Sequence, residues 1–312
     1  MVNETRSLLP TDLLTLVAHS GLSYQNQAWP RERLGSSDQA ALGVVKDQLL
    51  AFARRRSAWV SVRRQRMLGL VGARQRGGSE AWEVDYLIDS TKDQSVAGKL
   101  LEQAVSEAGK DGAQKLFLRI AAQSPAFTAT TMAGFVAYQE ERLYVRTPRP
   151  DESPLRLRPA VPSDSYPLFR LYCAATPEAT RRYEAATFTE WHASLEQKWA
   201  RGGIHLVHEQ EGAVRASVRA ARLSHGLMVD LLLDPMVIGE AGALVAAAAA
   251  TSAAQDQPVH VLVPCRSEAL AANLEQAGFA AMGDFVSLMR RTARPLSLPK
   301  KVAVVAENAV GV

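Results

Sequence analysis

Two acidic side chains, Glu83 and Asp85, stand two residues apart in the alternating run "AWEVDYLID". The alternation predicts a β-strand that places both carboxylates on one face together with Leu87 and Asp89. A carboxylate beside a reactive carbonyl can accept the proton of an attacking amine, directly or through water, or attract a cationic substrate. A half-exposed strand face with solvated acids explains the pair equally well, and both interpretations stay open.

A short polar turn follows this strand and leads directly into a helix predicted over residues 96–108. Three small residues, Ser95, Ala97 and Gly98, stand where the helix begins. The first N–H groups of a helix have no partner within it and lie at the positive end of its dipole, so they favour anions. The turn therefore predicts either an anion site or a tight strand-to-helix connection without a ligand.

The chain also repeats itself, since "AGFVAY" and "AGFAAM" place Gly134 and Gly278 144 residues apart. A spacing of 152 holds near the start of each copy, so a length difference of eight residues falls in the helical region between. We therefore predict a tandem duplication. The pairs at 144 are Leu87 with Leu231, Ala97 with Ala241, Gly98 with Gly242, Leu100 with Leu244 and Ala104 with Ala248, and those at 152 are Arg6 with Arg158, Pro10 with Pro162 and Asp12 with Asp164.

Each copy shows the same order of predicted elements, which indicates an α/β fold with a mixed sheet. Helical patterns over 12–18 and 37–55 come first, then three strands, a helix, a strand, a second helix and a final strand. The proline-rich stretch "TPRPDESP" has the composition of a linker. We therefore predict a first domain over 1–148, a second over 154–294 and a loose tail over 295–312.

This order, with a small-residue turn after the middle strand and "GF" before the last one, resembles the GNAT superfamily of acyl-CoA-dependent N-acyltransferases. The resemblance covers nearly the whole chain, twice over, as in tandem members of that family. In the family the turn reads Arg/Gln-x-x-Gly-x-Gly/Ala. The first copy places Lys92, Ser95 and Ala97 at the fixed positions, so serine replaces a glycine. The corresponding residues of the second copy are Met236, Gly239 and Ala241.

The resemblance implies that backbone amides of the turn bind the CoA diphosphate and that the preceding strand pairs with the pantetheine arm. It implies transfer of an acyl group, expected to be acetyl from acetyl-CoA, to the primary amine of a small molecule, without a metal. Glu83 or Asp85 would be the base or the amine-binding group, which favours a cationic acceptor. The cofactor-binding residues that the resemblance implies are Leu87, Ile88, Lys92, Gln94, Ser95, Val96, Ala97, Gly98 and Lys99.

Departures from the family pattern leave a second hypothesis open. Family members often use a tyrosine on the helix before "GF" as the acid for the leaving thiolate, but the chain has Thr130 and Leu274 there. At the spacing of 144 the counterparts of the acidic pair are Leu227 and Val229, so the acids favour the first copy as the CoA-binding half. The alternative is a non-catalytic tandem protein that binds acyl-CoA as a sensor or a protein partner as a scaffold.

Composition excludes several other classes of function. The 36 basic and 32 acidic residues leave a net charge of only +4, and the arginines clustered over 54–76 come with no nucleic-acid motif. Cys173 and Cys265 cannot form a disulfide framework and lack metal spacing. The apolar run over 241–250 is too short to span a bilayer, and the first ten residues lack the pattern of a secretion signal. We expect a cytoplasmic protein without a nucleic-acid or membrane partner.

Overall fold

A computed structural model describes residues 4–9, 12, 25–36, 56–64, 66–91, 95–147, 153, 155–196, 203–252 and 257–292. The predicted helix over 37–55, most of the one over 12–18 and the tail over 295–312 lie outside these residues. Lys92 and Gln94 of the predicted cofactor site also lie outside them.

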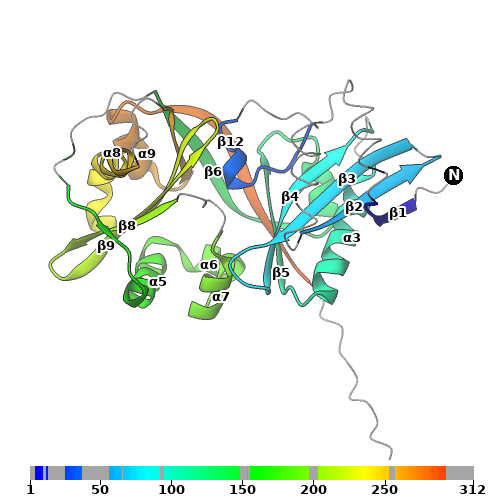
Figure 1. Ribbon diagram of the computed structural model, residues 1–312, viewed down its shortest axis with the longest axis horizontal. Helices are drawn as coiled ribbons and strands as arrows, with labels where there is room; N and C mark the ends of the chain where they lie inside the picture. The colour runs from blue at the N-terminus through cyan, green and yellow to red at the C-terminus, as the bar shows by residue number, and fades with distance from the viewer. Residues whose placement is uncertain are drawn as a thin grey trace, which may run out of the picture.

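The described residues form the α/β fold with a mixed sheet that the sequence predicts, and the same element order occurs twice (Figure 1). The elements of the first copy are β1 (Glu4–Ser7), η1 (Arg31–Arg33), β2 (Arg56–Arg63), β3 (Arg66–Gln75), β4 (Ala81–Asp89), α3 (Ala97–Lys110), β5 (Lys115–Ala121), α4 (Phe127–Met132) and β6 (Val136–Arg146). Those of the second copy are β7 (Arg158–Pro159), η2 (Pro162–Asp164), α5 (Ser165–Ala175), α6 (Glu178–Glu184), α7 (Phe188–Ser194), β8 (Ile204–Gln210), β9 (Ala213–Leu223), β10 (Gly226–Leu233), η4 (Pro235–Glu240), α8 (Ala241–Thr251), β11 (Val259–Pro264), α9 (Glu268–Gln276) and β12 (Ala280–Arg291).

One sheet of twelve strands runs through both copies, in the order β1-β2-β3-β4-β5-β12-β6-β11-β10-β9-β8-β7. Neighbouring strands are antiparallel except β4–β5 and β10–β11, which are parallel and joined by α3 and α8. The last strand of the second copy, β12, lies between β5 and β6, and the last strand of the first copy, β6, pairs with β11. The two copies have therefore exchanged their last strands, which run side by side across the middle of the molecule (Figure 1).

The exchange makes each hydrophobic core depend on both copies. Val286 and Leu288 of β12 belong to the core under α3, and Tyr144 of β6 belongs to the core under α8 and α9. Full burial of one such aliphatic side chain contributes about 1.5–3 kcal/mol. The predicted domain limits, 1–148 and 154–294, remain a prediction, because the sheet and the cores run across them.

Equivalent elements and contacts recur at the two predicted spacings. The helices α3 and α8 begin 144 residues apart, as do the strands β6 and β12. At the spacing of 152, Arg6 forms a bidentate ion pair with Asp12 at 2.7 and 2.9 Å, and Arg158 forms the same pair with Asp164 at 2.7 and 2.9 Å. The predicted tandem duplication is confirmed by these matching positions.

The two "GF" pairs end the helices α4 and α9 in the same way. Gly134 and Gly278 adopt positive φ angles of 78° and 85°, a left-handed conformation that favours glycine after a helix. The phenylalanine that follows donates its N–H to the carbonyl of Thr130 in one copy and of Leu274 in the other. Both of these residues are fully buried, at 0% exposure, and their carbonyls accept the hydrogen bonds that end the two helices.

A β-bulge in β4 corrects the predicted alternation of that strand. Asp85 is an extra residue in the pairing of β4 with β3. Beyond the bulge the faces are reversed, so Leu87 lies with Val84 in the core under α3. Strict alternation wrongly places Leu87 on the face of Glu83.

The bulge also corrects the match between the acids of the two copies. The pairing of β10 with β9 has no register shift, and its core-facing residues follow one another at intervals of two. Val229 therefore corresponds to Val84 and Asp230 to Tyr86, while the inserted Asp85 has no counterpart; Asp230 nevertheless gives the second copy an acid on this strand. The core residues that match are Trp82 with Leu227, Val84 with Val229 and Leu87 with Leu231.

Candidate functional site

Each parallel strand pair opens into a gap after a short ladder. The ladder between β4 and β5 ends at Glu83 and Phe117, and the one between β10 and β11 ends at Val229 and Val261. Beyond these points the strands turn backbone N–H and C=O groups toward the gap, where an extended ligand could pair with them. Because the two gaps are equivalent in the duplication, their contents can be compared directly.

The protein's own segment 25–29 fills the gap of the first copy. The Leu87 N–H donates to Oδ1 of Asn26 at 2.8 Å, and the Gln27 N–H donates to the Leu87 carbonyl at 2.7 Å. Asn26 also forms an antiparallel bridge with Ile88. The backbone that the resemblance assigns to the pantetheine arm is therefore paired with the chain itself.

The first backbone N–H groups of α3 are also bound by side chains of the protein itself. Oδ2 of Asp89 accepts hydrogen bonds from the N–H groups of Val96 at 3.0 Å and Ala97 at 2.8 Å. The Ser95 N–H donates to Oγ1 of Thr91 at 3.0 Å. A carboxylate of the chain thus stands where the resemblance places a diphosphate, and its charge opposes a second anion.

The other residues predicted for the first copy differ in their exposure and contacts. Lys99 is exposed, and Gly98 lies close to α4. Glu83 is 6% exposed, and its carboxylate accepts a hydrogen bond from Nε of Arg74 at 2.6 Å. Asp85 is 1% exposed at the bulge. The carboxylate of Glu83 is therefore held in a buried ion pair and not presented to a substrate.

Replacing Asp89 by alanine is expected to lower the free energy of unfolding by about 1–2 kcal/mol, because the first amides of α3 lose their acceptor. The matched control is Asp89→Asn, which keeps one side-chain oxygen and should lose less. Urea unfolding measures both variants. An unchanged stability of the alanine variant would show that these amides find other acceptors.

In the second copy a cavity of about 210 Å³ occupies the equivalent gap. Leu231 and Leu270 of its lining pack in the core under α8 and α9, whereas Tyr172 and Trp191 pack in the cluster under α5 and α7. The lining comes from both faces of the sheet, so the cavity passes through the sheet between β10 and β11. Within the described part of the chain, no segment pairs with β10 in this gap.

The edge of β10 presents backbone groups to the cavity. Leu227 donates its N–H across the ladder to the Pro258 carbonyl at 2.8 Å. Because backbone groups alternate between the two edges of a strand, those of Leu231 and Leu233 point to the same side, beyond the end of the ladder. The groups that hold the chain's own segment in the first copy thus face the cavity in the second.

The start of α8 differs from that of α3 in a way that suits an anion. Asp89 has Leu233 as its counterpart, and of the acids nearby, Asp234 accepts a hydrogen bond from the Met236 N–H while Glu240, directly before α8, pairs with His208 at 3.6 Å. Gly239 is exposed, and a Cβ atom added to it would meet nothing within 4 Å. The side-chain amide of Asn273 accepts from the Gly242 N–H at 2.9 Å and donates to the Gly239 carbonyl at 2.6 Å. The turn is therefore fixed from behind and open on its outer side.

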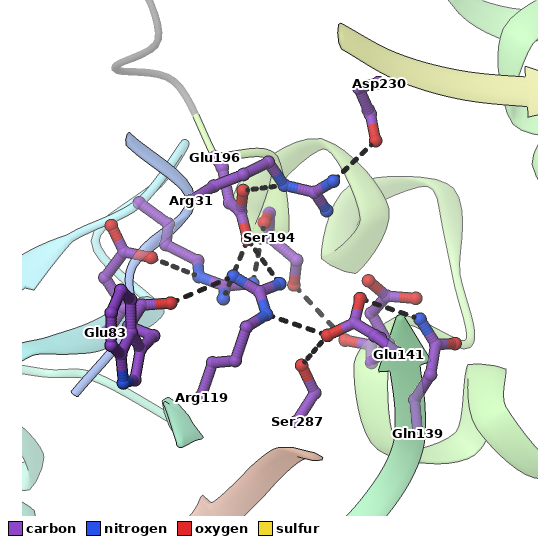
Figure 2. Close-up of polar contacts among 12 residues, drawn as sticks. Arg31, Glu83, Arg119, Gln139, Glu141, Ser194, Glu196, Asp230 and Ser287 are labelled. Atoms are coloured by element: carbon purple, nitrogen blue, oxygen red, sulfur yellow. Dashed lines mark hydrogen bonds and ion pairs between the residues drawn. The ribbon is translucent and has the colours of Figure 1, made fainter. Parts of the chain in front are cut away.

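Arginines and acids gather at the end of the cavity where the two copies meet (Figure 2). Arg31 of η1 binds Glu196 at 2.6 Å and Asp230 at 2.8 Å. Arg119 of β5 binds Glu141 of β6 at 2.7 Å. Burial alone would raise the pKa of Glu141 and of Glu196, but the surrounding guanidinium groups lower both. Their ion pairs with arginines hold both carboxylates in place at this end of the cavity.

Glu184, the last residue of α6, lines the same cavity, but its carboxylate is bound differently from those of Glu141 and Glu196. Its carboxylate accepts a hydrogen bond from the Tyr172 hydroxyl at 3.1 Å, and it has no salt bridge with another described residue. Burial raises the pKa of Glu184, because its negative charge is poorly solvated. A carboxylate with a raised pKa inside a cavity is suited to accept a proton from an amine.

The sequence carries one signal for this site. Asp230 is a single acid within the apolar strand "GLMVDLLL", where the first copy has Tyr86 at the spacing of 144. Glu184 and Arg31 belong to segments without a motif, and only the fold brings them to the cavity.

The described residues contain neither a membrane-spanning helix nor a metal-binding cluster. No helix there combines the length and apolarity that crossing a membrane requires. The same residues contain no group of three or more histidine, cysteine, aspartate or glutamate side chains placed to hold a metal ion. Cys173 and Cys265 are not joined in a disulfide.

The chain is similar to solved structures of acetyltransferases. A GCN5-related N-acetyltransferase from Sphaerobacter thermophilus matches with a TM-score of 0.56 and 15% identity, over 93% of this chain and 95% of that one. A tandem GNAT protein from the clavulanic acid biosynthesis pathway matches with a TM-score of 0.52 and 13% identity, over 94% and 99%. Neither a protein-family model nor a curated protein sequence matches. At these identities the likeness shows the fold, and the predicted tandem GNAT fold is confirmed.

Proposed function

We propose that the protein is an acyl-CoA-dependent N-acyltransferase whose second copy binds the acyl-CoA, with acetyl-CoA as the expected donor. The observation that carries this proposal is the cavity through the sheet between β10 and β11. A donor entering from the face of α8 and an acceptor entering from the face of α5 and α7 would meet inside it. The first copy supports this site and does not repeat it, because its own chain fills the equivalent gap.

The donor would be held largely by backbone. The amides of the pantetheine arm would pair with Leu231 and Leu233 on the edge of β10, as a strand pairs with its neighbour. The diphosphate would lie outside Gly239 at the start of α8, where the helix dipole favours negative charge. The thioester would then reach the part of the cavity lined by Glu184.

The acceptor amine would approach from the side of α5 and α7. Glu184 accepts one proton of the amine while the nitrogen forms a bond to the acyl carbon and the carbon–sulfur bond breaks. The proton then passes to the leaving thiolate, so the products are an N-acyl amine and free CoA. A thiolate is a good leaving group, so the absence of a tyrosine at Thr130 and Leu274 slows this step and does not prevent it.

A non-catalytic acyl-CoA-binding protein is the second candidate, and the same missing tyrosine favours it. Tight binding of acetyl-CoA without release of CoA in the presence of any amine would support this candidate. Steady release of CoA with one amine would exclude it. We expect the cytoplasm as the compartment in either case, in keeping with two cysteines that form no disulfide.

The assignment to the second copy can be tested with two matched variants, because Gly239 and Ser95 are counterparts at the spacing of 144. Gly239→Trp is expected to weaken acetyl-CoA binding at least tenfold in calorimetry, since the indole would fill the place of the diphosphate. Ser95→Trp is expected to leave the affinity unchanged. The opposite pattern would assign CoA to the first copy, at Lys92 to Lys99, as the sequence predicts.

A further inference from the structure

Arg219 on β9 places a cation in the cavity that no described acid binds. It lies directly opposite Asp230 in the ladder between β9 and β10, but the carboxylate of Asp230 binds Arg31 at 2.8 Å. Arg219 itself has no hydrogen bond or salt bridge with the part of the chain that the structure describes. Arg219 is half-buried, so its guanidinium group is partly removed from water, and an anion that enters the cavity gains a charge-assisted contact with it.

The strand beside Arg219 also offers a hydroxyl group and a neutral ring. Ser217 lies two residues earlier on the same face of β9 and lines the cavity, and its hydroxyl shares a hydrogen bond of 2.8 Å with Nε2 of His205. Burial, followed by the positive charge of Arg219, lowers the pKa of His205 to about 4. The imidazole is therefore neutral at pH 7. A carboxylate placed here would meet the forked donors of Arg219 and a hydroxyl group.

Another part of the cavity lining, on α6, carries a negative charge. Glu184 there carries a carboxylate without an ion-pair partner in the described residues, next to the Tyr172 hydroxyl. At the rim, Arg266 donates a hydrogen bond to Oε1 of Gln139 at 2.9 Å and forms no ion pair with another described residue, although the charge of Glu184 acts on it. One part of the lining thus suits an amine and the other suits an anion.

We propose that the acceptor is an amine that also carries a carboxylate, which Arg219 binds while the amine faces Glu184. The substrate class is therefore an amino acid or a compound with an amino-acid end. This inference rests on the proposed function. It differs from the purely cationic acceptor that Glu83 and Asp85 suggest from the sequence.

The test compares matched acceptors in an assay of CoA release from acetyl-CoA. The probes are the twenty protein amino acids and the amines that differ from them only by loss of the carboxylate. We expect at least a tenfold higher kcat/KM for an amino acid than for its decarboxylated partner in the wild-type protein. Arg219→Gln should abolish that preference through a higher KM, whereas Arg222→Gln, an exposed arginine on the same strand, should keep it.

Three results would overturn the inference. They are equal or faster turnover of the decarboxylated amines, a preference that survives Arg219→Gln, and turnover of neither set although acetyl-CoA binds. If acetyl-CoA does not bind at all, the proposed function fails separately. Calorimetric titration with N-acetylglycine then decides about the anion site, because binding to the wild type but not to Arg219→Gln supports it and binding to neither refutes it.

Discussion

Glu184→Gln is expected to lower kcat for CoA release by about 100-fold to 10,000-fold, the range that general-base catalysis contributes. Glutamine keeps the size of the side chain and can still accept the hydrogen bond of Tyr172, so the cavity should keep its shape. It cannot accept a proton from the amine. The affinity for acetyl-CoA should therefore stay near the wild-type value while turnover collapses.

The pH profile separates this role from a structural one. A base must be ionised to accept a proton, so kcat/KM should fall as the pH drops through the pKa of Glu184, which burial raises above 4.5. This acidic limb should disappear in Glu184→Gln. The matched control is Glu178→Gln, an exposed acid of the same helix, which should keep both the rate and the limb. A wild-type pH profile in Glu184→Gln would remove Glu184 from the mechanism.

The sequence alone predicts the repeat and its strand–turn–helix unit, because both depend on local patterns. The spacing of 144 predicts the starts of α8 and β12 from those of α3 and β6. Alternation predicts β4 correctly as far as Asp85. There a single inserted residue turns the rest of the strand over, and no residue type marks the bulge.

Local sequence patterns do not predict the strand exchange or the segment that fills the gap of the first copy. The strands β6 and β12 follow the same "GF" turn and are similar in length, so no local pattern decides which sheet each one closes. Which strand pairs with β5 is decided by the whole chain. Asn26 fills the first gap through one amide side chain and backbone bonds, a role that many polar residues could take.

The same comparison explains why the acidic pair pointed to the first copy. Glu83 and Asp85 have the residue types of a catalytic pair, but Arg74 of β3 and Arg76 just after it bind Glu83, and Asp85 is buried at the bulge. In the first copy the chain itself fills the gap and the acids are bound or buried, so these residues support the neighbouring cavity. Its η1 segment, next to the segment that fills the gap, delivers Arg31 to Asp230.

Arg119→Met should lower the free energy of unfolding by about 3–5 kcal/mol, the range for breaking a buried ion pair from one side. The side chains of Arg119 and Glu141 are only 6% and 4% exposed, and they join β5 to β6 across the exchanged strand β12. Ser287 of β12 also donates to Glu141 at 2.6 Å. Methionine would fill the space of the arginine and leave the carboxylate of Glu141 buried without its main counter-charge.

A double-mutant cycle in urea shows whether the loss comes from the unpaired charge. Adding Glu141→Leu to Arg119→Met should recover part of the lost stability, because no buried charge is then left unpaired. The matched control is the pair of Arg142 and Asp284, which joins β6 to β12 at 2.7 Å but is 45% and 47% exposed. Arg142→Met should change stability little, since water solvates both of its charges. Equal losses in the two arginine variants would mean that the exchanged strands are held by their ladders and cores alone, and that the buried charges at the junction serve only the cavity.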